Sequence, residues 1–423
     1  MDSAPAGEVF EHSPRVRHLL EAARRAFIVH GFAGVSIDGL ARDAGVSKET
    51  IYRHFADKEA LFRAALEEMG SEFVSRAEAL HRAAPPAGEE LTALAQAVLD
   101  SAVDGGLLSP LRVAADVAGV MPDFAADLQA LQWRRMESVR RALEDHARED
   151  QGRAAATVPL ELALDFGSLA VGGTALLMGF PDPSPQERAR LAGHVAALFG
   201  EGVLHAVALK TADWDDPAPA SAEQPAPPKA PHLRALLDVA ARHFLAQGFE
   251  GARLLDIGTE AKVGRGTLYR HFTNKAGLFA ATLRDLAAQV ADSAEPPALP
   301  SLTAGVPAVE QGLSLFAAAA MKALASPQSI ALHRAAISVA TRDPELARQV
   351  HDTVREPWVA ALAAWLEGEL RLAAPRWLAR EFLVLALQGN RLFSTGRTIP
   401  AEEVPMRADR VARVFLHGFR AGL

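Results

Sequence analysis

The sequence contains no cysteine, and this absence removes several kinds of chemistry from consideration. Disulfide bridges, cysteine-ligated zinc and thiol catalysis all require that side chain. Aromatic residues make up only 6% of the chain, and Val and Ile are sparse beside Ala and Leu. Because Ala and Leu favour helices whereas strands favour β-branched and aromatic residues, the composition predicts an all-α fold.

Targeting and membrane segments are also lacking. The N-terminal residues MDSAPAGEVFEHSPRVRHLL contain no apolar signal core. The longest uncharged apolar run, between Phe166 and Phe180, is shorter than the roughly 20 residues of a typical membrane-spanning helix. We therefore expect a cytoplasmic protein that makes no membrane contact.

The motifs of common enzyme classes are missing as well. The chain has no GxxxxGKS/T, HExxH or GxSxG sequence and no strand-borne GxGxxG. The glycine-bearing stretch VGGTALLMG lies in a helical pattern instead. We accordingly predict that the protein is not an enzyme and uses neither a cofactor nor a metal ion.

An internal repeat dominates what the sequence does contain. When the chain is shifted by 217 positions, residues 19–66 align with residues 236–283 without a gap, and 20 of the 48 positions are identical. Matches at the same shift continue beyond this segment, for example Gly179 with Gly396. We infer that a whole unit is duplicated rather than a short motif.

The segment DWDDPAPASAEQPAPPKAPH separates the two copies. Its six prolines prevent a regular helix and its composition cannot build a core. We therefore predict an extended linker, which at about 3.1 Å per residue could span roughly 60 Å.

Charge is unevenly distributed along the chain. The net charge is −8, yet residues 15–66 carry nine basic and six acidic side chains, and residues 232–283 carry seven and four. Each of these segments is therefore positive by three, while the remainder is strongly acidic. A local basic face is sufficient for binding nucleic acid, so the acidic total does not exclude that function.

The stretch SIDGLARDAGVSKETIYRHF at 36–55 has the spacing of a helix-turn-helix. Ser36 is placed to cap a short helix that ends near Ala44. Gly45 suits a tight turn with positive φ, and Ser47 is an N-cap candidate for a second helix, Lys48–His54.

The second of these helices has the composition of a DNA-reading helix. Ile51 and Phe55 are spaced four apart and should face the core, which leaves hydroxyl, aromatic and basic side chains for a major groove. We expect Lys48 and Thr50 to reach base edges or phosphate, Tyr52 and His54 to clamp the backbone, and Lys58 to contact phosphate at a helix start. The candidate DNA-contacting residues of this copy are Ser36, Ser47, Lys48, Thr50, Tyr52, Arg53, His54 and Lys58.

These residues resemble a known family. The run GFAGVSIDGLARDAGVSKETIYRHFADKEALF is similar to the DNA-binding domain of TetR/AcrR-type transcriptional regulators, and about 50 residues in each copy share the likeness. The C-terminal stretches RDPELARQVHDTVREPWVAALAAWLEGEL and ADRVARVFLHGFRAGL resemble the AefR-like subgroup. The resemblance implies an all-helical fold, dimers formed through the last two helices as a four-helix bundle, and repression of an operator that is relieved by a small-molecule effector.

The second copy, RLLDIGTEAKVGRGTLYRHFTNKAGLF at 253–279, departs from the first at its caps and turn. Arg253 replaces the capping Ser36, and Gly264 replaces the capping Ser47. Lys262 replaces the turn glycine, so we expect a strained lysine with positive φ that costs on the order of 1 kcal/mol. The candidate contact surface is retained as Arg253, Arg265, Thr267, Tyr269, Arg270, His271 and Lys275.

The repeat and the resemblance together predict five parts. They are a first helix-turn-helix domain, a first C-terminal helical domain, a linker, a second helix-turn-helix domain and a second C-terminal helical domain, at 1–58, 59–212, 213–231, 232–275 and 276–423. We expect the helices at 159–179 and 185–210 to pack on those at 375–395 and 401–421 as an intrachain pseudo-dimer. The small residues Gly167, Gly172, Gly173 and Gly193 would permit close approach. A homodimer of whole chains is the alternative.

Two further questions stay open at this level. A ligand pocket between the C-terminal helices could be lined by Trp133, Met136, His333, Trp358 and Trp365, although such side chains at helical spacing are more often core. The alternative function is a helical interaction scaffold whose second helix-turn-helix no longer binds DNA. If both reading helices act, their differences at Lys48/Arg265 and Glu49/Gly266 predict an imperfect palindrome.

Overall fold

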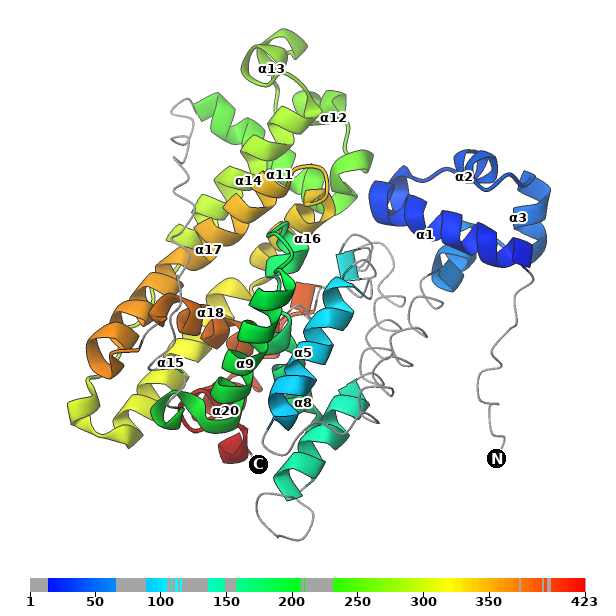
Figure 1. Cartoon of the computed structure of the whole chain (residues 1–423). Helices are drawn as coiled ribbons and strands as arrows, with labels where there is room; N and C mark the ends of the chain where they lie inside the picture. The colour runs from blue at the N-terminus through cyan, green and yellow to red at the C-terminus, as the bar shows by residue number, and fades with distance from the viewer. Residues whose placement is uncertain are drawn as a thin grey trace, which may run out of the picture. The chain divides into compact units, whose positions relative to one another are not determined.

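The computed structural model describes most of the chain and divides it into two compact units, Met1–Ser71 and Glu72–Leu423. The described residues are 14–65, 89–104, 108, 111–112, 115, 136–148, 157–206, 209, 231–372, 374–389, 392–393 and 397–422. Over these residues the chain is helical and contains no strand, which confirms the all-α prediction (Figure 1). The five-part domain division stays a prediction.

The first unit holds the first head, which we define as residues 14–58. Its helices are α1 (Pro14–Gly34), α2 (Ile37–Asp43) and α3 (Lys48–His54). The rings of Phe27 and Phe32 close on Phe62, with centroids 4.8 and 5.0 Å from it. This aromatic core fixes the helix-turn-helix on the chain that follows.

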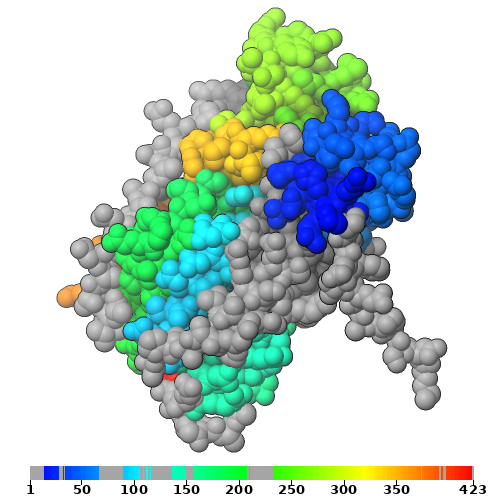
Figure 2. Space-filling view, turned by 45° about the vertical axis from the view of Figure 1, so that its right-hand side comes forward, coloured from blue at the N-terminus to red at the C-terminus, as the bar shows by residue number. Residues whose placement is uncertain are grey.

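The second head, residues 231–275, belongs to the other unit. Its helices are α11 (Pro231–Gly251), α12 (Leu254–Glu260) and α13 (Arg265–His271), and α14 (Lys275–Asp292) continues from it. The aromatic core is repeated, with Phe244 and Phe249 at 4.8 and 5.1 Å from Phe279. The helix α11 is broken at Gly248, whose φ is +69°. In the space-filling view this head projects from the rest of its unit (Figure 2).

The remaining helices form two C-terminal regions, which we call the first region (residues 89–206) and the second region (residues 293–422). The first region contains α5 (Glu90–Val103), a helix at 136–148, α8 (Leu160–Ala170), η1 (Ala175–Met178) and α9 (Pro185–His205). The second contains η2 (Leu302–Ala304), α15 (Val306–Leu324), α16 (Pro327–Val339), α17 (Pro344–Trp365), η3 (Leu366–Leu370), α18 (Pro375–Ala386), α20 (Val404–His417) and η4 (Phe419–Gly422).

Two of the helices predicted from the sequence are shorter than expected. The segment 159–179 is not one helix, because Gly172 and Gly173 have φ of +64° and +62° and end α8 before η1 begins. The segment 375–395 ends in the same way, with Gln388 and Gly389 at +56° and +58° after α18. A right-handed helix cannot continue through left-handed residues, so both helices stop at equivalent places.

The two C-terminal regions pack on each other within one chain. The helix α9 lies against α20, and α8 lies against α18. A side chain added at Gly173 would meet Val384 at 2.7 Å, and one added at Gly389 would meet Ser168 at 2.4 Å. These two contacts are the same contact repeated with a shift of 216 positions, as expected for a self-complementary interface between related halves.

A second reciprocal contact lies at the other end of the bundle. A Cβ at Gly202 would lie 2.4 Å from the backbone of Leu416 and His417, and one at Gly418 would lie 2.3 Å from the carbonyl oxygen of Gly200. The predicted close approach therefore occurs, but mainly through glycines that the sequence did not single out. Of the predicted four, only Gly173 takes part.

The other three predicted glycines have different surroundings. A Cβ on Gly172 or Gly193 would meet nothing within 4 Å, and one on Gly167 would meet the sulfur of Met136 in the same region. Their small size is therefore not required at the bundle contact.

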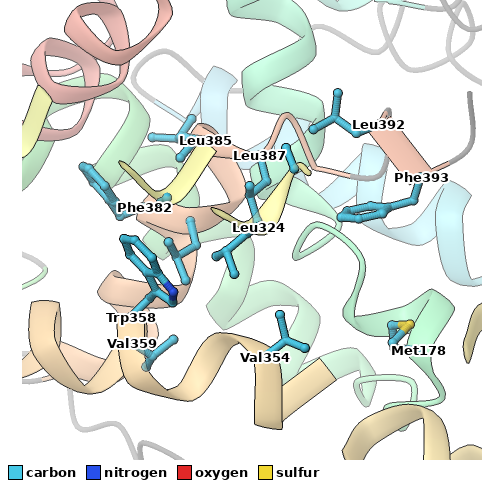
Figure 3. Close-up of a cluster of buried hydrophobic side chains, with 14 of the residues drawn as sticks. Met178, Leu324, Val354, Trp358, Val359, Phe382, Leu385, Leu387, Leu392 and Phe393 are labelled. Carbon is cyan, nitrogen blue, oxygen red and sulfur yellow. The ribbon is translucent and has the colours of Figure 1, made fainter. Parts of the chain in front are cut away.

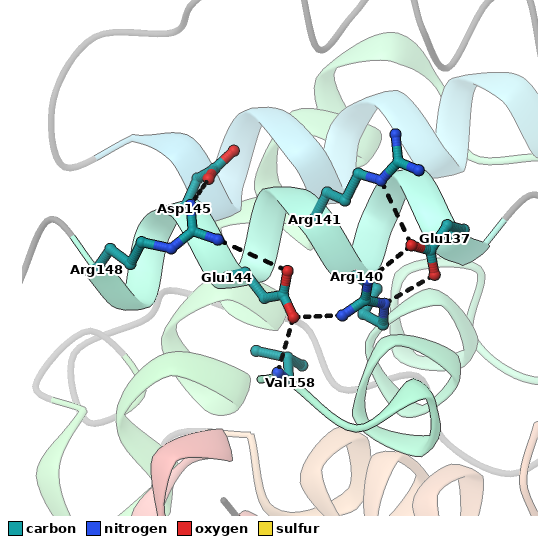
Figure 4. Close-up of polar contacts among 7 residues, drawn as sticks. All are labelled: Glu137, Arg140, Arg141, Glu144, Asp145, Arg148 and Val158. Atoms are coloured by element: carbon teal, nitrogen blue, oxygen red, sulfur yellow. Dashed lines mark hydrogen bonds and ion pairs between the residues drawn. The ribbon is translucent and has the colours of Figure 1, made fainter. Parts of the chain in front are cut away.

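An acidic and basic network holds the first region where α8 begins. Glu144 accepts a hydrogen bond from the backbone N–H of Val158 at 3.1 Å and pairs with Arg140, which also bonds Glu137 (Figure 4). The Arg140 hydrogen bond lowers the pKa of Glu137 to about 2. The network ties the helix at 136–148 to the residue that precedes α8.

Among the described helices none is by itself long and apolar enough to cross a membrane, although the bent pair Val306–Leu324 and Pro327–Val339 together meets the length and composition of a span. Both helices of that pair contribute many buried residues to the core.

Candidate nucleic-acid interface

The first reading helix, α3, is held by two side-chain caps and a glycine turn. Ser36 accepts a hydrogen bond from the N–H of Gly39 at 3.0 Å, and Ser47 accepts one from the N–H of Thr50 at 3.2 Å. Gly45 has φ of +63° in the turn between α2 and α3. These observations confirm the predicted caps and the predicted conformation of the turn.

The second reading helix, α13, has the same shape without those supports. Neither Arg253 nor Gly264 makes a side-chain cap, and Lys262 has φ of +56° in the turn. The strained lysine and the two lost caps are therefore as predicted. Backbone hydrogen bonds still close the turn, since the N–H of Val263 donates to the carbonyl of Gly258 at 2.8 Å.

Each reading helix buries one residue, half-buries its threonine and exposes the others. Ile51 is fully buried and its equivalent Leu268 is 2% exposed. The chain has only two tyrosines, and they occupy the same position in α3 and α13. Tyr52 is 46% exposed and Tyr269 is 45% exposed. The two heads therefore present the same aromatic side chain to solvent at the same position of the reading helix.

The structure places all of the predicted contact residues at the surface of their heads. None of Ser36, Ser47, Lys48, Thr50, Tyr52, Arg53, His54, Lys58, Arg253, Arg265, Thr267, Tyr269, Arg270, His271 and Lys275 is buried. In each head the threonine and the final lysine are half-buried and the others are exposed. The two faces therefore match position by position.

The residue that opens each reading helix is held differently. Lys48 forms an ion pair of 2.9 Å with Asp38, and that hydrogen bond raises the pKa of Lys48. The position of Asp38 is taken in the second head by Leu255, which is 73% exposed. Arg265 instead lies over the ring of Tyr269, 5.6 Å from its centroid. A carboxylate thus shields the cation of the first head but not that of the second.

The lysine after each reading helix rests on an aromatic ring. The Nζ of Lys58 lies 4.5 Å from the ring centroid of Phe32, and that of Lys275 lies 4.8 Å from Phe249. Lys275 also donates to the carbonyl of Glu250 at 3.0 Å. Partial burial lowers the pKa of both amines. Each ammonium is fixed in place beside the start of the next helix.

Four of the five residues predicted for a ligand pocket lie among the described residues, and they have different neighbours. Trp133 lies outside the described residues, and Met136 packs near Gly167 in the first region. Trp358 is core, with its ring 5.4 Å from Phe316, and the indole N–H of Trp365 donates to Pro300 at 2.8 Å. Only His333 among them meets a buried charged side chain.

Sequence reasoning missed the pairing of Lys48 with Asp38 and the exposure of Leu255. The aligned copies contained the signal, because Asp38 of the first copy aligns with Leu255 of the second. The burial of Arg355 had no comparable signal in the sequence, because its neighbours along the chain do not predict that it is buried.

Comparison with known proteins agrees with this geometry. The pattern of the family "Bacterial regulatory proteins, tetR family" matches residues 19–65 and again residues 236–282. The pattern of the "AefR-like transcriptional repressor, C-terminal domain" matches residues 311–421. Both heads and the second C-terminal region are therefore covered.

Individual relatives cover smaller parts. The HTH-type transcriptional repressor AcnR of Corynebacterium diphtheriae is 43% identical over 58 residues, which is 14% of this chain and 30% of the relative. AcnR of Corynebacterium glutamicum is 42% identical over 52 residues, 12% of this chain and 28% of the relative. The chain thus spans about a third or less of the length of these curated relatives.

A solved structure described as a candidate TetR-family transcriptional regulator of Mesorhizobium loti is 25% identical, with a TM-score of 0.37. It covers 43% of this chain, and 92% of that structure is matched. The chain therefore carries two N-terminal domains that match the TetR family of bacterial regulatory proteins, and a C-terminal domain that matches AefR-like repressors.

Proposed function

We propose that the protein is a DNA-binding transcriptional regulator, most simply a ligand-responsive repressor, whose α3 and α13 read the two halves of one operator. The observation that carries the proposal is the matched exposed face of the two reading helices, centred on the only two tyrosines of the chain. Double-stranded DNA is the partner whose surface suits short helices with hydroxyl, aromatic and basic side chains.

The proposed contacts follow the position of each side chain. Lys48 and Arg265 open the reading helices and reach base edges or phosphate, as do Thr50 and Thr267. The tyrosines, with His54 and its equivalent His271, clamp the DNA backbone. Arg53, Arg270, Arg253 and the two ring-supported lysines supply the sequence-independent attraction to phosphate. The hydroxyls of Ser36 and Ser47 are proposed to lie near the DNA backbone as well.

One chain is proposed to supply both halves of the binding unit. The reciprocal glycine contacts between α8 and α18 and between α9 and α20 support an intrachain pseudo-dimer. Since the two reading helices differ, the operator should be an imperfect palindrome. The proposed place of action is the cytoplasm, where the DNA is.

Mobility shifts with DNA that flanks the protein's own gene test the assignment of the heads. We expect Tyr52→Ala and Tyr269→Ala each to weaken binding at least fivefold, which corresponds to about 1 kcal/mol. Met406→Ala, on the exposed part of α20, is the control and should bind as wild type. Equal binding by all four proteins would remove both helices from the interface. Loss only in Tyr52→Ala would favour the alternative, in which the second helix-turn-helix no longer binds DNA.

The mass of the binding unit tests the pseudo-dimer. Native mass spectrometry should give 45.0 kDa for the free protein and one chain per operator in the complex. Twice that mass would instead support a homodimer of whole chains with four heads.

A further inference from the structure

Arg355 on α17 is a buried cation in the interior of the larger unit. Its side chain is 7% exposed. One terminal N–H donates to Nε2 of His333 at 2.6 Å, and the other terminal nitrogen donates to the hydroxyl of Thr174 at 3.2 Å. Thr174 belongs to the first region and directly precedes η1, so the guanidinium bridges the two C-terminal regions.

His333 is arranged to accept this hydrogen bond rather than to carry a charge. Its Nδ1 lies 2.8 Å from the carbonyl oxygen of Ser329, which requires the proton on Nδ1 and leaves a lone pair on Nε2. Burial, together with the neighbouring Arg355, holds the pKa of His333 well below its ordinary value. The neutral imidazole therefore orients the guanidinium without balancing its charge.

No carboxylate balances that charge within the described part of the chain. Among the residues that the structure describes, no acidic side chain forms an ion pair with Arg355. The acid that acts on it from farther away is Asp352, which is held at 3.1 Å by His351. Burial lowers the pKa of Arg355 to about 10. A buried cation without a paired anion is costly, and the two described hydrogen bonds engage two of its five N–H groups.

A second arginine approaches the same place from the first region. Arg112 is half-buried and donates to the carbonyl oxygen of Leu176 in η1 at 2.7 Å. Burial lowers its pKa, and its described contacts likewise include no carboxylate at ion-pair distance. Two cations, one from each C-terminal region, thus converge on residues 174–178.

The other side of Arg355 is apolar. The ring of Phe393 lies 5.7 Å from the guanidinium carbon and 4.9 Å from the His333 ring. Phe393 belongs to a cluster of buried hydrophobic side chains that also includes Met178, Leu324 and Val354 (Figure 3). A charged anchor beside an apolar cluster is the arrangement that binds an organic acid with an apolar body.

We propose that Arg355, with Thr174 and His333, anchors the carboxylate of a small apolar monocarboxylate between the two C-terminal regions. This inference rests on the proposed regulatory function, because it names the chemical class of the effector. The carboxylate accepts from the uncommitted guanidinium N–H groups, and the apolar body replaces contacts within the neighbouring cluster.

The position of the anchor also suggests how binding reaches the DNA. Arg355 lies on α17 and His333 on α16, and these helices pack on α14 and α11, which carry the second head. A ligand shifts the equilibrium only if it favours one arrangement of these helices over another. A carboxylate that draws α16 and α17 toward Thr174 meets this condition for the second head directly.

In the sequence, the position equivalent to Arg355 in the first copy is not basic. The sequence PDFA at 122–125 corresponds to PELA at 344–347, and this register places Trp133 where the second region has Arg355. The chain should therefore bind one such ligand rather than two.

The test uses the full chain and its intrinsic tryptophan fluorescence, with butyrate, benzoate and decanoate as probes and 1-decanol as the uncharged match for decanoate. We expect at least one carboxylate to bind with one ligand per chain, and decanol to bind at least tenfold more weakly than decanoate. Arg355→Met should weaken the carboxylate at least about tenfold, as expected for a lost charge-assisted hydrogen bond. Decanol binding should be unchanged.

Two variants keep the outcome interpretable. Arg348→Gln removes another bond across the regions, from Arg348 to the carbonyl of Gly179, and should bind the carboxylate as wild type. If circular dichroism shows that Arg355→Met is unfolded, Thr174→Val provides the same test and should weaken binding several-fold. Failure of all three carboxylates to bind, or equal binding by wild type and Arg355→Met, would overturn the proposal. The mobility shift without ligand would still report the regulator function separately.

Discussion

The two copies of the repeated unit keep the same surface on different local supports. The first reading helix has two serine caps and a turn glycine, whereas the second has neither cap and a lysine at positive φ in the turn. Both nevertheless expose the same tyrosine to the same extent. The packing of Phe244, Phe249 and Phe279 therefore maintains the second head where local signals have been lost.

The two heads also differ in charge, and here the second head has the stronger feature. Residues 36–55 carry three basic and three acidic side chains, whereas residues 253–272 carry four and two. The head with weaker local support is thus the more basic one. The local support of the reading helix and the charge of the head therefore vary independently between the two copies.

The two C-terminal regions can be compared in the same way, because two equivalent acidic residues have different surroundings. Asp165 on α8 lies 3.3 Å from Nε of Arg410, although the angle is too poor for a hydrogen bond. With the shift of 216 positions its equivalent is Glu381 on α18, and the equivalent of Arg410 is His194. Glu381 is 5% exposed, and one of its carboxyl oxygens has no described hydrogen-bond partner. Burial raises the pKa of Glu381 to about 8.

The largest expected effect comes from exchanging these two acids for amides. Because the folded state raises the pKa of Glu381, its contribution is greatest below the unfolded pKa and is lost as the pH rises through about 8. Glu381→Gln should therefore increase the free energy of unfolding at pH 8.5 by about 2 kcal/mol and have little effect at pH 4. Asp165→Asn should decrease it by about 3 kcal/mol, because Arg410 loses its carboxylate.

Denaturant midpoints of both variants at pH 4, 5.5 and 8.5 provide the measurement. A Glu381→Gln protein that matches wild type at every pH would contradict the assigned ionisation. Destabilisation by both variants alike would show that the two acids are equivalent after all.

The next effect concerns the acid that shields the first reading helix. Asp38→Asn removes the partner of Lys48 and should strengthen operator binding about fivefold, with a steeper salt dependence. Leu255→Asp introduces that acid in the second head and should weaken binding by a similar factor. Mobility shifts at several salt concentrations measure both, and Glu21→Gln on the exposed face of α1 controls for net charge. If Glu21→Gln strengthened binding as much as Asp38→Asn, the ion pair would have no special role.

A smaller effect should follow from exchanging the turn residues. Lys262→Gly should stabilise the second head by about 1 kcal/mol because it relieves the positive φ, and Gly45→Lys should destabilise the first by the same amount. Amide hydrogen exchange in α13 and α3 reports these local stabilities. Lys262→Ala retains the unfavourable conformation and should give no such gain. A gain as large in the alanine variant would assign the effect to the lysine charge instead.

The smallest effect is expected at the caps of the reading helices. Ser47→Gly should cost the first head a few tenths of a kcal/mol, and Gly264→Ser should return a similar amount to the second. Amide hydrogen exchange in α3 and α13 measures both changes. Opposite signs would mean that the hydroxyl of Ser47 is needed less for capping than for its contact with Thr50.

Much of each head could be predicted because its determinants are close together in the sequence. Ser36 and Ser47 each accept from a backbone N–H three residues on, and Gly45 acts through its own positive φ, so their roles followed from spacing. The surface positions of Tyr52 and Tyr269 followed in the same way from the period of a short helix. The Asp38–Lys48 pair joins two helices across the turn, and spacing alone did not reveal it.

By itself, the sequence determined that the chain is helical, duplicated and built around two heads with matched exposed faces and unequal caps. These properties depend on residue type and on neighbours within a few positions. Only the tertiary structure decided that Gly173 meets Val384 and Gly389 meets Ser168, and that Arg355 is buried against Thr174. It also decided that Asp165 pairs with Arg410, whereas one carboxyl oxygen of the buried Glu381 has no described hydrogen-bond partner. Those contacts join residues 181 to 245 positions apart, and their meeting depends on how the two copies pack rather than on any local pattern.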